Sequence, residues 1–154
     1  MNVAHTQSLE THPSNCESSF WVWFPSEVSL NSSYEVALQS IVVPMDACLD
    51  VNHESEREKL INNHIMIYCS IVKKSIVGNA LAQLLDTAPC AELALFSQDK
   101  AAFYTVPYLT WHSIETSKFH KMKFYVTTVT GEEVKFKPLR EPIVYNLSFR
   151  MRKM

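Results

Sequence analysis

The last third of the chain contains short stretches in which apolar and polar residues alternate. Residues 121–129 (KMKFYVTTV) and 132–137 (EEVKFK) flank the pair Thr130-Gly131, and such a pair between two alternating stretches is typical of a β-hairpin turn. Residues 142–151 (PIVYNLSFRM) alternate over their whole length. Because successive side chains of a strand point to opposite faces, these stretches predict half-buried strands. The side chains expected to point inward are Phe124, Val126, Val134, Phe136, Ile143, Tyr145, Leu147, Phe149 and Met151.

The rest of the chain repeats this pattern, with turn residues between the segments. One short surface helix is expected between Asp50 and Asn63, where the stretch ESEREKLINN is rich in helix formers. Seven or eight strands without βαβ alternation predict two antiparallel sheets around one core, in a jelly-roll or an immunoglobulin-like arrangement. The further strand candidates are residues 18–25, 34–43, 64–73, 91–97 and 104–109.

The chain is expected to form one folding unit behind a polar arm. Its 154 residues, 47% of them hydrophobic, supply enough apolar side chains for a single core. The first residues mix Asn, Thr, Ser, His, Pro and Glu without periodicity, as flexible segments do. The sequence therefore predicts a flexible N-terminal arm over residues 1–17 and a single domain over residues 18–154.

Two adjacent strand candidates carry apolar side chains on both faces. In the first, Trp21 and Trp23 lie opposite a second apolar face, and in the next, Ile41 and Val43 fall on the nominally polar face. Exposed apolar and aromatic side chains usually mark protein interfaces. Trp21, Trp23, Ile41 and Val43 are thus the candidate subunit interface, and an enlarged core is the alternative.

No pattern in the sequence indicates catalysis, a cofactor or a bound metal. The six histidines are scattered, without the H-x-H pair of a cupin-type metal site. The two glycines form neither a nucleophile elbow nor a phosphate-binding loop. The four cysteines lie far apart, without a C-x-x-C pair, and are interpreted as reduced. We expect a protein that is not an enzyme and that uses no cofactor, metal or small-molecule substrate.

Positive charge gathers toward the C-terminus. Residues 118–154 hold nine of the 14 Lys and Arg residues but only three of the 16 Asp and Glu residues. The basic residues recur at strand spacing, which favours solvated strand faces over a nucleic-acid site. In the predicted hairpin only Tyr125 is placed to stack on a base, because Phe124 and Phe136 point inward. Nucleic acid is therefore disfavoured as a partner, and no apolar run is long enough for a membrane-spanning helix.

Three longer blocks carry a family resemblance. Residues 14–44 join a polar segment, an extended strand, a Pro, and a strand that contains EVAL and ends at a second Pro. Residues 67–89 contain a Tyr-Cys strand, then IVG and a Leu pair, and residues 103–153 contain a hairpin with Gly at its turn, V-x-F and a last strand ending L-x-F-R. Together they resemble the Polinton/Maverick-type (virophage-like) penton proteins. The chain departs from that pattern at Ser70, where an acidic residue is usual.

The resemblance implies a viral structural protein. Its expected fold is all-β, a single jelly-roll sandwich of about eight antiparallel strands with one short helix. Its expected function is that of a penton-type minor capsid subunit, which assembles as a homopentamer at capsid vertices and contacts the major capsid protein. It is then expected in the virion, after assembly inside the host cell. The alternative is a monomeric β-sandwich module that binds carbohydrate or protein.

Overall fold

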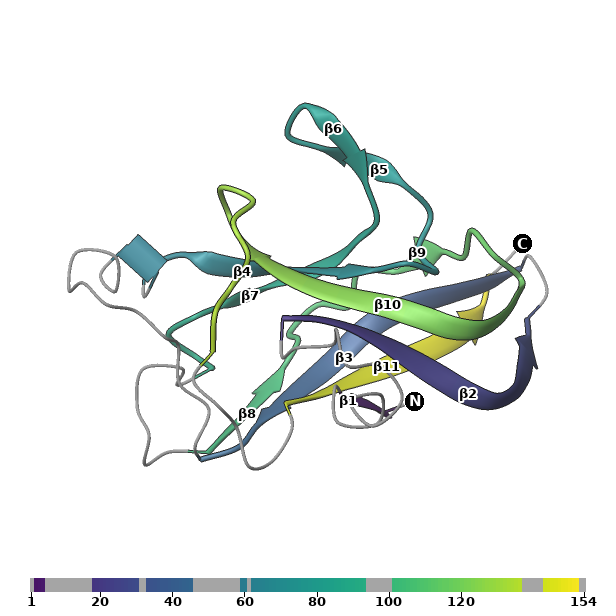
Figure 1. Cartoon of the computed structure of the whole chain (residues 1–154), viewed down its shortest axis with the longest axis horizontal. Coiled ribbons are helices and arrows are strands. Elements are labelled where there is room, and N and C mark those ends of the chain that lie inside the picture. Colours follow the sequence, from purple (N-terminus) through teal and green to yellow (C-terminus); the bar gives the residue numbers. More distant parts are fainter. Residues whose placement is uncertain are drawn as a thin grey trace.

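The computed structural model shows an all-β protein in which two antiparallel sheets face each other (Figure 1). It describes residues 2–4, 18–30, 33–45, 59–60, 62–93, 101–136 and 143–152. The predicted all-β class and antiparallel pairing are confirmed. The strands are β1 (Asn2–Ala4), β2 (Ser19–Ser29), β3 (Tyr34–Val43), β4 (His64–Cys69), β5 (Ser75–Val77), β6 (Ala80–Ala82), β7 (Leu84–Pro89), β8 (Ala102–Thr105), β9 (His112–Ser113), β10 (Lys118–Thr128) and β11 (Val144–Met151).

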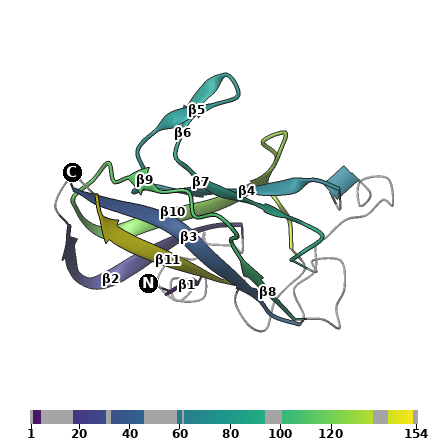
Figure 2. The same cartoon turned by 180° about the vertical axis from the view of Figure 1, so that it is seen from behind.

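Each large sheet joins strands from both halves of the chain. One sheet has five strands, in the order β1-β11-β3-β8 with β9 also paired to β3, and the other has four, in the order β2-β10-β4-β7. The four-stranded sheet lies across the five-stranded sheet, as the views from opposite sides show (Figures 1 and 2). Sheets stacked in this way bury the side chains of their inner faces between them.

Three stacked aromatic rings join the two sheets in the core. Phe20 of β2 and Phe124 of β10 have ring centroids 5.6 Å apart and planes that differ by 8°. Tyr145 of β11, on the opposite sheet, lies 5.7 Å from the Phe124 ring and 6.3 Å from the Phe20 ring. None of the three residues is more than 1% exposed. Because aromatic side chains bury large apolar areas, this cluster is a main contact between the sheets.

A β-bulge in β3 reverses the expected facing of its last residues. Two neighbours on β11, Asn146 and Leu147, pair with residues two apart on β3, which leaves Gln39 as an extra residue. One extra residue turns the side chains that follow it to the other face of the sheet. Ile41 and Val43 are consequently in the core, each 1% exposed, rather than on the polar face where the alternation had placed them.

The predicted C-terminal hairpin is present only around its turn. Gly131 has a φ of 88°, a left-handed conformation that glycine adopts easily. The return segment, as far as it is described, has isolated bridges at Glu133, which pairs with Thr127, and at Phe136, but it forms no strand. The carbonyl of Ser18 accepts the N–H of Val126 at 2.8 Å, so β2 and the residue before it already occupy this edge of β10. Only the last residues of β10 remain open to the return segment.

Most side chains that were predicted to point inward do so. Met151 is the clear exception, since it is 59% exposed at the end of β11. Phe136 and Phe149 are half-buried at the margin of the core. The buried residues among those predicted are Phe124, Val126, Val134, Ile143, Tyr145 and Leu147.

Three predictions fall wholly or partly outside the described residues. Within the expected arm, Asn2–Ala4 forms β1 and pairs with β11, and Ser18 marks where the description resumes. The expected short helix is described only at residues 59–60 and 62–63 and stays a prediction. Of the weak strand candidate at residues 91–97, the first three residues form a turn and the others lie outside the described part.

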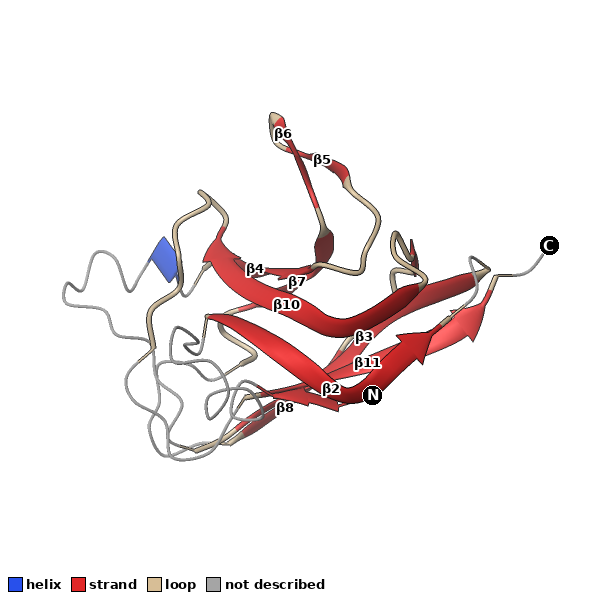
Figure 3. Ribbon diagram, turned by 45° about the vertical axis from the view of Figure 1, so that its right-hand side comes forward, coloured by secondary structure: helices blue, strands red, loops and turns tan. Residues whose placement is uncertain are grey.

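The strands β5 and β6 form a small hairpin that stands away from the sandwich (Figure 3). Two residues, Gly78 and Asn79, connect the strands, and Gly78 has a φ of 61°, as two-residue hairpin turns require. Ile76 and Leu81 pair across the hairpin and are 79% and 68% exposed. The hairpin therefore presents large apolar side chains to solvent.

Candidate functional site

The outer face of the four-stranded sheet carries a row of aromatic and lysine side chains. The inward residues of β10 alternate with Lys121, Lys123 and Tyr125, which therefore point outward. In the pairing with β2, Lys121 lies opposite Trp23 and Lys123 lies opposite Trp21. We call these five residues the aromatic-lysine row, in the order Trp23, Lys121, Trp21, Lys123 and Tyr125.

Each ammonium group of the row lies between two aromatic rings. The Nζ of Lys121 is 4.7 Å from the ring centroid of Trp21 and 5.1 Å from that of Trp23. The Nζ of Lys123 is 5.7 Å from the ring centroid of Trp21 and 6.0 Å from that of Tyr125. These distances are within the range of cation–π attraction. The row is thus a continuous alternation of rings and positive charges.

The row is accessible, and no carboxylate of the described residues forms an ion pair with its lysines. Trp23 is 42% exposed, and Trp21, Lys123 and Tyr125 are half-buried. Among the described residues, no ion pair involves Lys121 or Lys123. Burial, and secondly the phenol of Tyr68, raise the pKa of Tyr125 above its ordinary value of 10.0. The Tyr125 phenol therefore stays neutral beside the two lysines at ordinary pH.

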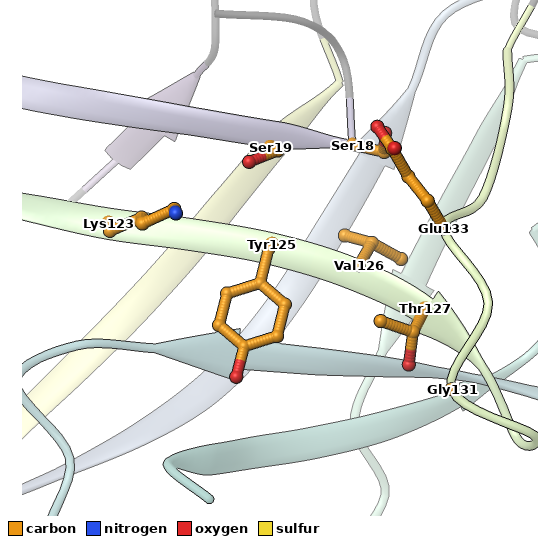
Figure 4. A pocket seen from close by; sticks show the side chains of 8 residues that line it. All are labelled: Ser18, Ser19, Lys123, Tyr125, Val126, Thr127, Gly131 and Glu133. Atoms are coloured by element: carbon orange, nitrogen blue, oxygen red, sulfur yellow. The ribbon is translucent and has the colours of Figure 1, made fainter.

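A shallow hollow of about 330 Å³ continues the row at the start of β2 (Figure 4). The ring of Tyr125 stacks on that of Tyr68 at 4.4 Å, with planes 7° apart, which holds the phenol in place. At the rim, the Ser18 hydroxyl donates to Glu133 Oε1 at 2.7 Å. The lining therefore combines hydroxyls, one ring, an ammonium and a carboxylate, and its residues are Ser18, Ser19, Lys123, Tyr125, Val126, Thr127, Gly131 and Glu133.

The structure separates the four residues that the sequence had joined in one candidate interface. Trp21 and Trp23 lie on the outer face of the four-stranded sheet, and their role as an interface stays a prediction. Ile41 and Val43 are core residues of the five-stranded sheet, so they offer no surface to a partner. The sequence reasoning missed that Lys121 and Lys123 lie beside these tryptophans, because no local pattern indicates that β2 pairs with β10.

Apart from the row and its hollow, a pair of ionisable side chains, Asp86 and His112, lies at the edge of the sandwich. Burial raises the pKa of Asp86 above its usual value of 3.8, against the opposing effects of the Thr87 N–H and of His112. The Nε2 of His112 lies 2.7 Å from the carbonyl oxygen of Leu85. Within the described ranges, no group of three or more His, Cys, Asp or Glu residues is placed to hold a metal ion. No helix in the same part of the chain is long and apolar enough to span a membrane.

The fold and the site define an antiparallel β-sandwich with an aromatic and basic outer face. Comparison with family models, curated proteins and solved structures finds no match to the chain.

Proposed function

We propose that the sandwich is a jelly roll. The support is the order in which the strands pair: β1 with β11, β2 with β10, β3 with β8, and β4 with β7. These four pairs are nested, as in one long hairpin, and successive pairs fall alternately in the two sheets. When such a hairpin is rolled up, the strands β11 and β3 meet in one sheet and β10 and β4 in the other. Two four-stranded sheets built from one eight-stranded path are the jelly-roll arrangement.

We further propose that the protein is a non-enzymatic, penton-type minor capsid subunit. The nested strand order carries this proposal, because it is the order that the resemblance to Polinton/Maverick-type penton proteins leads one to expect. In this role the chain forms a homopentamer at a capsid vertex, contacts the major capsid protein and resides in the virion. Closed rings of identical subunits arise when one surface of each copy meets a different surface of the next.

The β5-β6 hairpin supports assembly, because it offers an apolar surface that its own subunit leaves exposed. Ile76 and Leu81 are 79% and 68% exposed on a hairpin that stands away from the sandwich (Figure 3). A second exposed group lies on and after β8, where Phe103 of the strand is 67% exposed and Tyr108 beyond it is 88% exposed. Such apolar side chains usually mark protein contacts. Two distinct apolar groups on one subunit are what a ring of head-to-tail contacts needs.

Mass measurement tests the assembly proposal directly. We expect light scattering or native mass spectrometry of the purified chain to give five times the subunit mass of 17.7 kDa. A chain that remains monomeric at high concentration, and that does not associate with a major capsid protein, would count against the capsid role.

Changing the hairpin is expected to weaken assembly without unfolding the subunit. Replacing Ile76 and Leu81 together by serine removes apolar surface that is already exposed in the subunit, so the subunit's circular dichroism should be unchanged. The dissociation constant of the oligomer should rise by about tenfold or more, as expected when two apolar anchors are lost. The matched control replaces Val129 and Met151, 50% and 59% exposed, by serine. Equal weakening by both variants would contradict a role for the hairpin.

A monomeric carbohydrate- or protein-binding module is the second candidate. The hollow beside Tyr125 favours such a binding module, because an aromatic ring, hydroxyl groups and an ammonium group line it together. Screening the monomer against glycans tests this role. Specific binding that is lost on changing Tyr125 to alanine would favour the module over the capsid subunit.

A further inference from the structure

The aromatic-lysine row alternates aromatic rings and ammonium groups along the outer face of one sheet. Its rings come from two strands, Trp21 and Trp23 from β2 and Tyr125 from β10, while Lys121 and Lys123 lie between them. A single-stranded nucleic acid repeats the complementary pair of chemistries, since planar bases alternate with anionic phosphates. We propose that this face binds single-stranded nucleic acid, with the rings stacking on bases and the lysines contacting phosphates.

The charges of the row favour an anionic partner. Within the described part of the chain, the two ammonium groups belong to no ion pair, and Glu133 supplies the only carboxylate among the residues that line the neighbouring hollow. That carboxylate accepts the Ser18 hydroxyl at 2.7 Å, at the far end of the row from Trp23. The middle of the face is therefore positive, and a polyanion that lies along it meets both lysines.

The rings distinguish nucleic acid from other anionic partners. A lysine held over an exposed ring is held weakly, so it can turn to a phosphate and leave the ring face to a base. Acidic peptides would satisfy the lysines but offer no planar groups to Trp21 and Trp23. A duplex keeps its base faces stacked inside, so a single strand is the form that uses the whole row. The sequence had disfavoured nucleic acid because Tyr125 was the only ring foreseen on this face, and the pairing of β2 with β10 supplies the other two.

Fluorescence anisotropy of a labelled oligothymidylate, titrated with the full chain, tests the proposal. We expect binding that weakens as salt is raised, with a slope of log K against log salt of about −0.7 for each lysine that contacts a phosphate. Replacing Lys121 and Lys123 by alanine should therefore make the slope less negative by about 1.4. The matched control replaces Lys73 and Lys74, which are exposed lysines outside the row, and should leave affinity and slope unchanged.

The contribution of stacking is measured at Trp23, which is the most exposed ring of the row. Trp23→Ala should weaken oligothymidylate binding by about 5- to 150-fold, the range measured for loss of one stacked base. Trp23→Phe keeps a ring and should retain most of the affinity, which separates lost stacking from a failure to fold.

Two results would overturn the proposal. One is no change in anisotropy at low salt with any oligonucleotide tested. The other is equal competition by polyglutamate, duplex DNA and the single strand together with full binding by Trp23→Ala, which would mean that the lysines attract any polyanion or an acidic protein. The oligomeric state of the same samples is measured separately, so failure here leaves the assembly proposal standing, and the reverse also holds.

Discussion

Replacing Phe124 by alanine is expected to lower the free energy of unfolding by about 3 to 5 kcal/mol, the range for a phenylalanine removed from a packed core. Phe124 is 0% exposed and stacks on Phe20 of its own sheet and on Tyr145 of the opposite sheet. The substitution opens a cavity between rings from three strands, which cannot close without moving the sheets together. Urea-induced unfolding, followed by tryptophan fluorescence, measures the change.

The control is Met151→Ala, because this methionine lies at the end of β11 with 59% of its surface exposed. Its loss should change the free energy of unfolding by no more than about 0.5 kcal/mol, as is usual for surface positions. If both substitutions cost the same, Phe124 does not join the sheets, and the contact across the sandwich must depend on other side chains.

The fold class could be predicted because its signal is local. Alternation along residues 142–151 places Tyr145 and Leu147 inward, as β11 does. Exact facing was not predictable where a bulge intervenes, since Gln39 becomes an extra residue only through pairing with β11. The prediction of a return strand over residues 132–137 was wrong for a similar reason, because β2 pairs with the edge of β10 that this strand would need.

Strand β7 shows a further limit of sequence reasoning. Its residues, LLDTAP, include an Asp and a Pro and do not alternate, so no strand was expected there. Ala88 and Leu85 are nevertheless buried, and β7 is held as a strand by its pairing with β4. Tertiary pairing overrides weak local propensity at such positions.

The candidate site could be predicted residue by residue but not as a group. Alternation alone places Lys121, Lys123 and Tyr125 on one face of β10, and it places Trp21 and Trp23 on one face of β2. Sequence distance separates the two sets by about a hundred residues, and no local pattern reports that the strands are neighbours. The pairing register of β2 and β10 brings the two sets side by side, and this register is set by the sheet as a whole and not by either strand alone.

Raising the pH from 9 to 11 is expected to lower the free energy of unfolding by about 2 kcal/mol through Cys69 alone, because the slope reaches its full value of about 1.4 kcal/mol per pH unit only once the unfolded thiol is mostly ionised. Burial raises the pKa of the Cys69 thiol from 9.0 to about 12, although a backbone hydrogen bond at Ile71 lowers it somewhat. Below pH 9 the folded and unfolded chains both keep this proton, so stability does not depend on it. Above pH 9 the unfolded chain loses the proton while the folded chain keeps it, and the stability present at lower pH is progressively lost until the pKa of the folded state is reached.

The contribution of Cys69 is isolated by comparing the protein with Cys69→Ala, because groups such as Cys90, whose pKa burial raises to about 11, titrate equally in both. Cys69→Ala should be less stable at pH 8, since a buried side chain next to Met122 is shortened. Its stability should then fall less steeply between pH 9 and 11, so the two curves approach each other as the pH rises. Parallel curves over this range would mean that the folded state gives up the Cys69 proton as easily as the unfolded chain does. The inner face of β4 would then be open to water, and the two sheets could not be closed over it in the way that the buried residues of β4 and β10 indicate.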